Sequence, residues 1–268
     1  MIFGDIPRDP IPLNSTRFVA FDLETTGVAM HKDRIVEIAL VAWKKGSKKE
    51  TFSTLVNPGV PVSQRSTDIH GLTNTLLRNA PFFVSIKNQI KDFIRDSVLI
   101  GFNVLSLDLS MLNKEIRLSG EPPFYNYIID VFSVINRVFN PIHEKSLAGV
   151  AKKLDIASQG NHRALPDAET TMKIWIKIVE KMERLGIHTL NEMFERGYFK
   201  TKLDEKAQQI FLLGRQQRFV EIIYDSPFSQ RTRRIIEPLG VRGSKLDAFC
   251  HLRADFRSFS TKYILEFK

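Results

Sequence analysis

Residues 17–27 read RFVAFDLETTG, an apolar stretch that ends in two acidic residues, two threonines and a glycine. The run 17–23 is short and rich in β-branched and aromatic residues, which predicts a buried strand. Side chains two apart on a strand share a face, so Asp22 and Glu24 are expected to point the same way. Neighbouring carboxylates repel each other, and a divalent cation that prefers oxygen ligands, such as Mg²⁺ or Mn²⁺, would remove that repulsion. Taken alone, however, this acidic pair favours an edge strand that ends in a polar turn.

The segments around this stretch predict a mixed α/β sheet with helices on its faces. Residues 34–43 (RIVEIALVAW) and 51–56 are two further strands, joined by the polar turn KKGSKKE, which makes an antiparallel meander of three. Strands and helices then alternate. Strands are expected at 98–100 and 128–130, and helices at 85–95, 108–118, 131–139, 147–154 and from Pro166 to about Leu185.

The two ends of the chain have different patterns. Three prolines predict an extended arm over residues 1–16, and weak periodicity predicts a linker over 186–205. Beyond it, a helix is expected near 205–215. Short strands are expected at 219–224, 233–238, 246–252 and 256–267, and four such strands predict a small β-barrel.

Composition limits the classes of function. The net charge of +9 is concentrated at the end of the chain, because residues 206–268 hold 12 of the 39 Lys and Arg but only 6 of the 30 Asp and Glu. This excess indicates a polyanionic partner or simply a solvated surface. The single cysteine, Cys250, excludes an internal disulfide framework and a cysteine-based zinc site. Without a secretory pattern in residues 1–16 or an apolar run of ~20 residues, a cytoplasmic protein with no membrane partner is expected.

Two later segments carry further candidates. In GFNVLSLDLSML (101–112), Asp108 begins a helix, an arrangement that is common in capping, and Asn103 orders the preceding loop. In NHRALPDAETT (161–171), Asp167 lies in the first turn of a helix and His162 in the loop before it. A loop histidine with a pKa near neutrality can accept a proton from water. Each residue alone is more typical of a structural or surface role.

Together these motifs resemble the DnaQ-like (DEDDh) exonuclease family of the ribonuclease H-like superfamily. FDLETTG, N-x-x-x-x-D and H-x-A-x-x-D-A occur in the family's order, and IHGLT at 69–73 also matches, so that the resemblance covers about residues 17–185. The sequence departs from the family at Phe102, where a histidine is usual, and in the spacing of Asn103 and Asp108, which is one residue longer than in many members. The departures bear on substrate preference.

The resemblance implies a two-metal 3′→5′ exonuclease that releases nucleoside 5′-monophosphates. Asp22, Glu24, Asp108 and Asp167 match the four acidic ligands of two Mg²⁺ or Mn²⁺ ions, and His162 matches the general base. Two ions about 4 Å apart hold the attacking water and the leaving 3′-oxygen in such enzymes. Nucleic-acid contacts are expected from Thr25, Thr26, His70 and Asn103.

The segment 218–264 resembles the SH3-like barrel of WYL domains, which act as nucleic-acid or nucleotide-ligand sensors. The likeness lies in I-x-Y, T-R-R-x-I-x-P-L-G and C-H-L-R-x-D-F-R-S-F, whereas Ser244-Lys245-Leu246 stand near the place of the Trp-Tyr-Leu triplet. A nucleic-acid-binding face interleaved with Phe256 and Phe259 is expected, because arginines grip phosphate and stack on bases. Its cationic residues are Arg231, Arg233, Arg234, Arg242, Arg253 and Arg257. Alternatively, the phenylalanines are core and the arginines are solvated.

Two functional hypotheses follow. The first is a processing exonuclease with residues 17–185 as its catalytic domain and a basic barrel over 206–268 that holds single-stranded nucleic acid, with single-stranded DNA as the favoured substrate. The second is a catalytically silent nuclease fold that acts as a nucleic-acid-binding or regulatory module. Retention of four carboxylates and a histidine favours the enzyme. The sequence leaves open DNA or RNA preference, the pathway (repair, RNA turnover or defence), the WYL-domain ligand and the oligomeric state.

Overall fold

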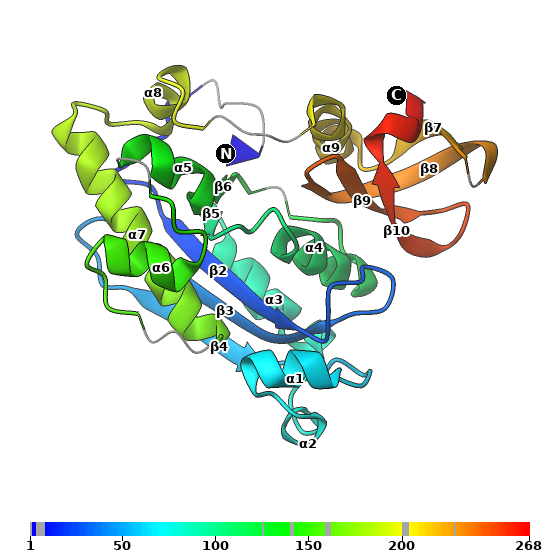
Figure 1. The fold of residues 1–268 in the computed structure, drawn as a ribbon, viewed down its shortest axis with the longest axis horizontal. Coiled ribbons are helices and arrows are strands. Elements are labelled where there is room, and N and C mark those ends of the chain that lie inside the picture. Colours follow the sequence, from blue (N-terminus) through cyan, green and yellow to red (C-terminus); the bar gives the residue numbers. More distant parts are fainter. Residues whose placement is uncertain are drawn as a thin grey trace. The chain divides into compact units, whose positions relative to one another are not determined.

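The structure is a computed structural model that describes residues 2–3, 9–124, 126–139, 142–158, 162–199, 204–227 and 229–268. The chain divides into two compact units (Figure 1). The first unit comprises Met1–Thr26, Ile35–Val104 and Asn126–Thr201, and the second comprises Gly27–Arg34, Leu105–Tyr125 and Lys202–Lys268. Each unit therefore draws on segments from distant parts of the chain, and the domain boundaries expected from the sequence stay a prediction.

The first unit is built on a six-stranded mixed sheet with the order β1-β6-β5-β2-β3-β4. The pairs β2–β3 and β3–β4 are antiparallel, which confirms the meander, whereas β5 and β6 run parallel to β2. β1 pairs antiparallel with β6 at the sheet edge. The strands are β1 (Ile2–Phe3), β2 (Phe18–Thr25), β3 (Ile35–Trp43), β4 (Glu50–Leu55), β5 (Val98–Gly101) and β6 (Ile128–Asp130).

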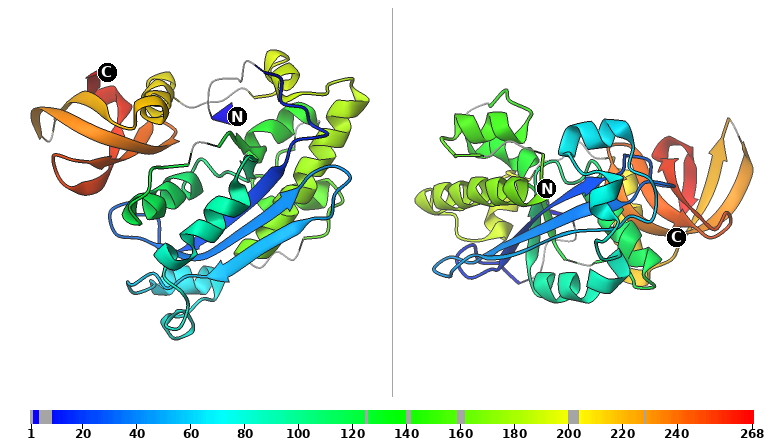
Figure 2. Two further views of the ribbon diagram at one scale, coloured as in Figure 1. Left: turned by 180° about the vertical axis from the view of Figure 1, so that it is seen from behind. Right: turned by 90° about the horizontal axis from the view of Figure 1, so that it is seen from below.

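Helices cover both faces of this sheet, as the sequence predicted for an α/β fold. In Figures 1 and 2, α5, α6 and α7 lie on one face and α3 on the other. α7 packs on β2 and β3, where the rings of Phe18 and Trp175 approach to 5.1 Å in the fully buried core. The helices are α1 (Gln64–His70), α2 (Asn74–Leu77), α3 (Phe83–Ile94), α5 (Val131–Val138), α6 (Leu147–Lys153), α7 (Ala164–Arg184) and α8 (Leu190–Glu195).

Helix α8 falls where the sequence predicted only a linker. It begins with a capping box, in which the side chain of Thr189 and the side chain of Glu192 each accept from the other's backbone N–H. Leu190 N–H donates to the carbonyl of Ile11, and Leu13 N–H donates to His188, so the arm at 9–16 is tied to this segment. Of the expected arm, residues 2–3 form β1, whereas residues 1 and 4–8, including Pro7, lie outside the described residues, as do linker residues 200–203.

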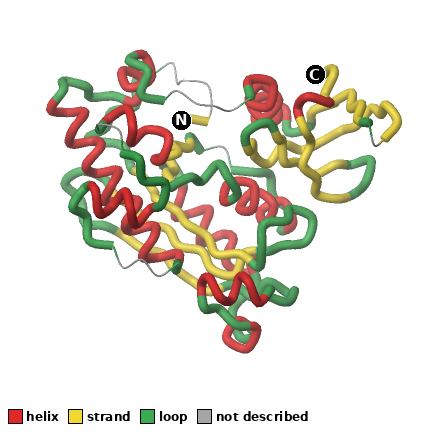
Figure 3. Tube along the Cα trace, in the orientation of Figure 1, coloured by secondary structure: helices red, strands yellow, loops and turns green. Residues whose placement is uncertain are grey.

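The second unit contains a five-stranded antiparallel sheet with the order β10-β9-β8-β7-β11, preceded by α9 (Glu205–Gln217) (Figure 3). The short helix η1 (Thr261–Tyr263) divides the last expected strand into two. Within the described residues the edge strands β10 and β11 do not pair with each other, so closure into a barrel is not confirmed. The strands are β7 (Val220–Ser226), β8 (Ser229–Arg242), β9 (Lys245–Cys250), β10 (Asp255–Ser260) and β11 (Ile264–Phe267).

Helix α4 (Asp108–Leu118) belongs to this second unit, because it packs against β8. The amide of Asn113 donates to the carbonyl of Leu239 at 2.8 Å, and Arg117 pairs with the buried carboxylate of Glu237 at 2.8 Å. A Cβ at Gly240 would collide with the side chain of Ser110, so only glycine allows this approach. The polar face of α4 is thus buried against the C-terminal sheet.

The loop Gly27–Arg34, which follows β2 directly, is also held by α4. The buried ammonium of Lys114 donates to the carbonyl of Asp33 at 2.5 Å. Arg34 makes a two-pronged ion pair with Glu115, with N–O distances of 2.5 and 2.7 Å. The loop is therefore an ordered part of the second unit. No helix among the described residues has the length and apolar character needed to cross a membrane.

Candidate active site

The strand β2 carries the first two acidic residues of the site. β5 pairs with β2 only from Phe18 to Ala20, whereas β3 pairs with it as far as Thr25. Asp22 and Glu24 thus lie beyond the part of β2 that β5 covers. Both are partly exposed, while the intervening Leu23 is buried, so the two carboxylates share the more open face of the strand.

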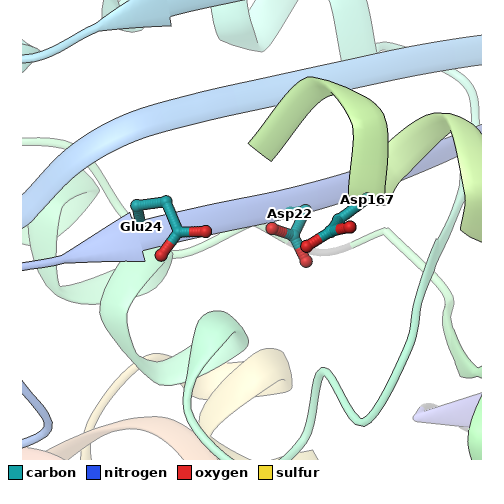
Figure 4. A group of neighbouring side chains, drawn as sticks. All are labelled: Asp22, Glu24 and Asp167. Atoms are coloured by element: carbon teal, nitrogen blue, oxygen red, sulfur yellow. The ribbon is translucent and has the colours of Figure 1, made fainter. Parts of the chain in front are cut away.

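Helix α7 brings a third carboxylate to the same place. Asp167 lies in its first turn, and carboxylate oxygens of Asp22, Glu24 and Asp167 all come within 4.8 Å of one another. Figure 4 shows the carboxylates of Asp22 and Asp167 side by side, with Glu24 nearer the end of β2. Residues 145 positions apart in the sequence (167 − 22) are thus brought together in the first unit.

The electrostatics of this cluster suit a cation. Burial raises the pKa of Asp167 above its usual range, the negative charge of Glu37 raises it further, and the charge of His162 lowers it. Keeping three half-buried carboxylates ionised at such short separations requires compensating positive charge. Oxygen ligands in this number fit a hard divalent ion. DnaQ-like exonucleases use divalent metal ions, and the acidic cluster has the donor set for one.

The start of α7 is fixed by a buried glutamate. Glu37 lies on β3 directly opposite Glu24 and is only 4% exposed. Its carboxylate accepts three hydrogen bonds from the guanidinium of Arg163, at 2.7, 3.0 and 3.2 Å. It also accepts the backbone N–H of Ala164, the first residue of α7, at 3.0 Å. A negative charge at a helix N-terminus is favourable, so Glu37 both caps α7 and binds the residue that precedes it.

His162 directly precedes Arg163 and Ala164, the two residues that Glu37 binds. It is exposed and has a φ of 44°, a left-handed conformation that costs a non-glycine residue roughly 1–3 kcal/mol. The ion pair between Arg163 and Glu37 therefore holds the His162 backbone in a conformation it would not adopt alone. Sequence reasoning missed both partners. A charged residue inside the apolar run 34–43 was the signal for Glu37.

Two residues of α1, Ser66 and His70, hydrogen-bond to the backbone at the end of β2. Leu72 N–H donates to Nδ1 of His70 at 3.0 Å, so Nε2 carries the proton and donates to the carbonyl of Thr25 at 3.3 Å. Ser66 donates to the carbonyl of Thr26 at 2.8 Å. Burial lowers the pKa of His70, which keeps the ring neutral. His70 thus lies behind the strand end, and contacts of Thr25, Thr26 and His70 with nucleic acid stay a prediction.

Asn103 and Asp108 follow β5, in different units. Asn103 is exposed with a φ of 58°, and its N–H donates to Asp130, which also accepts from Phe132 at the start of α5. Asp108 is the first residue of α4 in the second unit and is not one of the three clustered carboxylates. Its role as a metal ligand stays a prediction.

The six candidate arginines of the C-terminal sheet fall into two groups. Arg234, Arg242, Arg253 and Arg257 line one hollow in the second unit. Arg231 and Arg233 are exposed elsewhere and lie within 3.9 and 3.4 Å of the carboxylates of Glu266 and Glu221. Phe256 and Phe259 are buried, at 6% and 2% exposed. The phenylalanines are thus core residues, as one interpretation of the sequence held.

Comparison with known proteins supports the nuclease assignment. A family model described as Exonuclease matches residues 19–175, more than half of the chain. The DNA polymerase III subunit epsilon of Aquifex aeolicus is 31% identical over 185 residues, which are 68% of this chain and 91% of that protein. The PolC-type DNA polymerase III of Caldanaerobacter subterraneus is 27% identical over 234 residues, 84% of this chain but only 16% of the polymerase. The chain thus spans about a sixth of that relative's length.

Among solved structures, E. coli Exonuclease I in complex with a dT13 oligonucleotide superimposes with a TM-score of 0.58 at 14% identity, over 88% of this chain and 55% of that one. At this identity the likeness concerns the fold. The family match confirms the resemblance to DnaQ-like exonucleases, and it ends before the segment that resembles a WYL domain. The chain belongs to the exonuclease family.

Proposed function

We propose that this protein is a metal-dependent 3′→5′ exonuclease that removes nucleoside 5′-monophosphates from the 3′ ends of single-stranded DNA. The observation that carries the proposal is the convergence of Asp22, Glu24 and Asp167 at the open end of β2. The polymerase III relatives and the Exonuclease I solved with an oligonucleotide support DNA as the polymer. Phosphodiester hydrolysis needs compensation of the negative charge that builds on oxygen, and this cluster can recruit it.

In the proposed reaction the clustered carboxylates, with Asp108 as the fourth ligand, would hold two Mg²⁺ or Mn²⁺ ions. Such ions, when bound, lower the pKa of water and neutralise charge on the phosphate. His162 would accept the proton of the attacking water through its imidazole as the water oxygen bonds to phosphorus. The bond from phosphorus to the 3′-oxygen of the preceding nucleotide breaks, and that oxygen takes a proton from solvent. Arg163 and Glu37 hold the His162 backbone and the first turn of α7 in place. Thr25 and Asn103 are proposed to contact the terminal nucleotide, and the buried Thr26 and His70 to position the end of β2 behind it.

The C-terminal sheet is proposed to act as a WYL-like module that binds the nucleic-acid strand. The excess of basic over acidic residues in 206–268 supports this, as does the hollow lined by four of the candidate arginines. We further propose a cytoplasmic location, which suits the lone buried thiol of Cys250.

The test uses a 5′-labelled single-stranded oligonucleotide with Mg²⁺, Mn²⁺ or EDTA. The wild-type protein is expected to produce a ladder that shortens from the 3′ end with either metal and none with EDTA. Asp167→Asn removes one charge from the cluster and should lower the rate by about a thousandfold or more, because electrostatic stabilisation of this kind is worth several kcal/mol. Asp68→Asn removes an exposed carboxylate on α1 and should leave the rate unchanged.

A binding protein with a silent nuclease fold gives a different result. It would bind the labelled strand equally in EDTA and in Mg²⁺ and leave its length unchanged. Full activity in Asp167→Asn would likewise refute the assignment of the cluster. Single- and double-stranded DNA and RNA, compared at equal concentration, establish the substrate, and cleavage of RNA in preference to DNA would overturn the proposed polymer.

A further inference from the structure

A hollow of about 860 Å³ opens in the second unit between the loop that follows β2 and the strands β7 to β10. Its lining is strongly basic. Five lining side chains are cationic and one is acidic: Arg234, Arg242, Lys245, Arg253 and Arg257 against Asp255. Pockets of roughly 300–1,000 Å³ typically hold a ligand the size of a nucleotide or larger. The hollow is therefore too large for a lone phosphate ion, and its net positive charge is suited to binding a polyanion.

One lining arginine, Arg234, carries a buried positive charge. Arg234 is only 5% exposed, and its Nε donates to the hydroxyl of Thr232 at 2.9 Å. Its guanidinium lies 5.0 Å from the ring centre of Tyr224 and 5.6 Å from that of Phe259. Within the described ranges no carboxylate pairs with it. Two aromatic faces offset part of the cost of burying this cation, and an anion in the hollow would offset the remainder.

A second arginine is held in a fixed orientation. Arg242 makes two hydrogen bonds to the fully buried carboxylate of Asp247, at 2.5 and 2.8 Å, and a third to Ser258 at 2.9 Å. The guanidinium is thereby rigid, with 23% of the side chain still exposed. By contrast, Arg253 and Arg257 are exposed, and neither pairs with an acidic group in the part of the chain that the structure describes. The guanidinium groups of both residues can therefore bind a ligand at the mouth of the hollow.

The opposite wall comes from the loop Gly27–Arg34, through residues Val28 to His31. Lys114 and the pair Arg34–Glu115 anchor this loop to α4, so the wall is formed before a ligand arrives. Val28 is 70% exposed and offers an apolar surface of the kind on which a nucleobase can pack. The hollow thus combines cations that can contact phosphates with an exposed apolar side chain that a base can touch.

From these contacts we infer that the hollow binds the phosphodiester backbone of an unpaired nucleic-acid strand, at a site built from residues that do not belong to the acidic cluster. The inference deepens the proposed function, on which it rests for the nature of the polymer. An unpaired strand can place a phosphate deep enough to reach Arg234 and turn a base towards Val28. A duplex keeps its bases stacked inside and presents phosphates only on a convex surface.

The test compares two double variants that remove the same charge. Arg253→Gln with Arg257→Gln alters the mouth of the hollow, whereas Arg231→Gln with Arg233→Gln alters exposed arginines outside it that already face Glu266 and Glu221. Affinity for a fluorescent single-stranded oligonucleotide of about 20 nucleotides is measured by anisotropy in EDTA over a range of salt concentrations. EDTA suppresses hydrolysis, so binding is measured independently of catalysis.

The hollow variant is expected to bind about tenfold more weakly at low salt. Its dependence of log K on log salt should be shallower by about 1.4, because each phosphate contact on a single strand contributes ~0.7. The matched control should stay within about twofold of the wild-type affinity. Equal loss in both variants would overturn the site and leave only diffuse attraction by net charge.

Competition identifies the ligand. Unlabelled single strand should displace the probe, whereas duplex DNA, thymidine monophosphate and inorganic phosphate at equal phosphate concentration should displace it at least about tenfold less well. Equal competition by the mononucleotide would overturn the inference in favour of a nucleotide pocket. Hydrolysis of a dinucleotide in Mg²⁺ by the wild-type protein tests the proposed function separately from strand binding. A wild-type protein that fails to cleave the dinucleotide but binds strands through the hollow would refute the proposed function and leave this site standing.

Discussion

The two units each gather side chains of one charge sign, but they distribute those charges in different ways. In the first unit, three carboxylates from one strand and one helix turn meet within 4.8 Å. In the second, five cationic side chains from β8, β9, β10 and a turn surround about 860 Å³. Charges focused on one point suit a small ion of opposite sign. Charges spread around a hollow suit an extended polyanion, so each unit has the charge distribution for a different kind of ligand.

Both units pair their buried glutamates with cations, unlike the acidic cluster of the first unit. Glu37 forms an ion pair with Arg163, and Glu237 forms ion pairs with Arg117 and Arg218. Interactions with Arg218 and Arg117 lower the pKa of Glu237 although burial would raise it. Burial dominates at Asp167 instead and raises its pKa. The direction of the pKa shift thus separates a glutamate held in an ion pair from an aspartate in a carboxylate cluster.

The largest loss of kcat that distinguishes a catalytic residue from a structural one is expected at His162, the proposed general base. His162→Ala should lower kcat by roughly 10²–10⁴-fold, the usual contribution of a general base, with strand affinity in EDTA unchanged. His143→Ala removes another exposed histidine of the first unit and serves as the control. Single-turnover hydrolysis of a 5′-labelled strand measures the rate. A loss below about threefold would exclude His162 as the base.

A smaller effect is expected from the pair Glu37–Arg163, which we interpret as positioning residues. Glu37→Gln removes hydrogen bonds to a charged partner, worth ~1.5–3 kcal/mol, and should lower kcat by about 10–100-fold with KM nearly constant. Glu37→Asp keeps the charge and should restore part of the rate. Glu50→Gln serves as the control, because Glu50 lies on β4 and forms an ion pair with Arg17 at the surface. A rise in KM at constant kcat would assign Glu37 to substrate binding instead.

The sequence predicted the acidic face of β2 because strand alternation is a local property of residues 22 and 24. It also predicted α7, whose periodicity and proline are local. It could not predict the Glu37–Arg163 pair, whose partners are 126 residues apart, or the transfer of α4 to the second unit. That transfer depends on buried polar contacts of α4 with β8, and an amphipathic pattern does not reveal which sheet receives a helix. Arg231, Arg233 and Arg234 were all predicted to lie on one basic face. Strand alternation instead places Arg233 and Arg234 on opposite faces of β8.

The smallest effect concerns Lys114, which joins the loop after β2 to the second unit. Burial lowers its pKa to about 8, against 10.5 for a free lysine. Between these values the folded protein holds a neutral amine while the unfolded chain still binds the proton, so the free energy of unfolding rises with pH in that window. Lys114→Met removes the titrating group, and the stability of the wild type relative to this variant should therefore increase by about 2–3 kcal/mol from pH 8 to pH 10.5, one pKa unit being worth ~1.4 kcal/mol.

Urea unfolding of both proteins across this pH range measures the difference, and Lys32→Met, at an exposed lysine of the same loop, is the control. The control should track the wild type at every pH, because the Lys32 side chain is exposed in the fold. A difference between wild type and Lys114→Met that stays constant with pH would mean that the Lys114 ammonium remains protonated in the fold. The loop would then be held across this pH range by a hydrogen bond from a charged Lys114 ammonium to the Asp33 carbonyl.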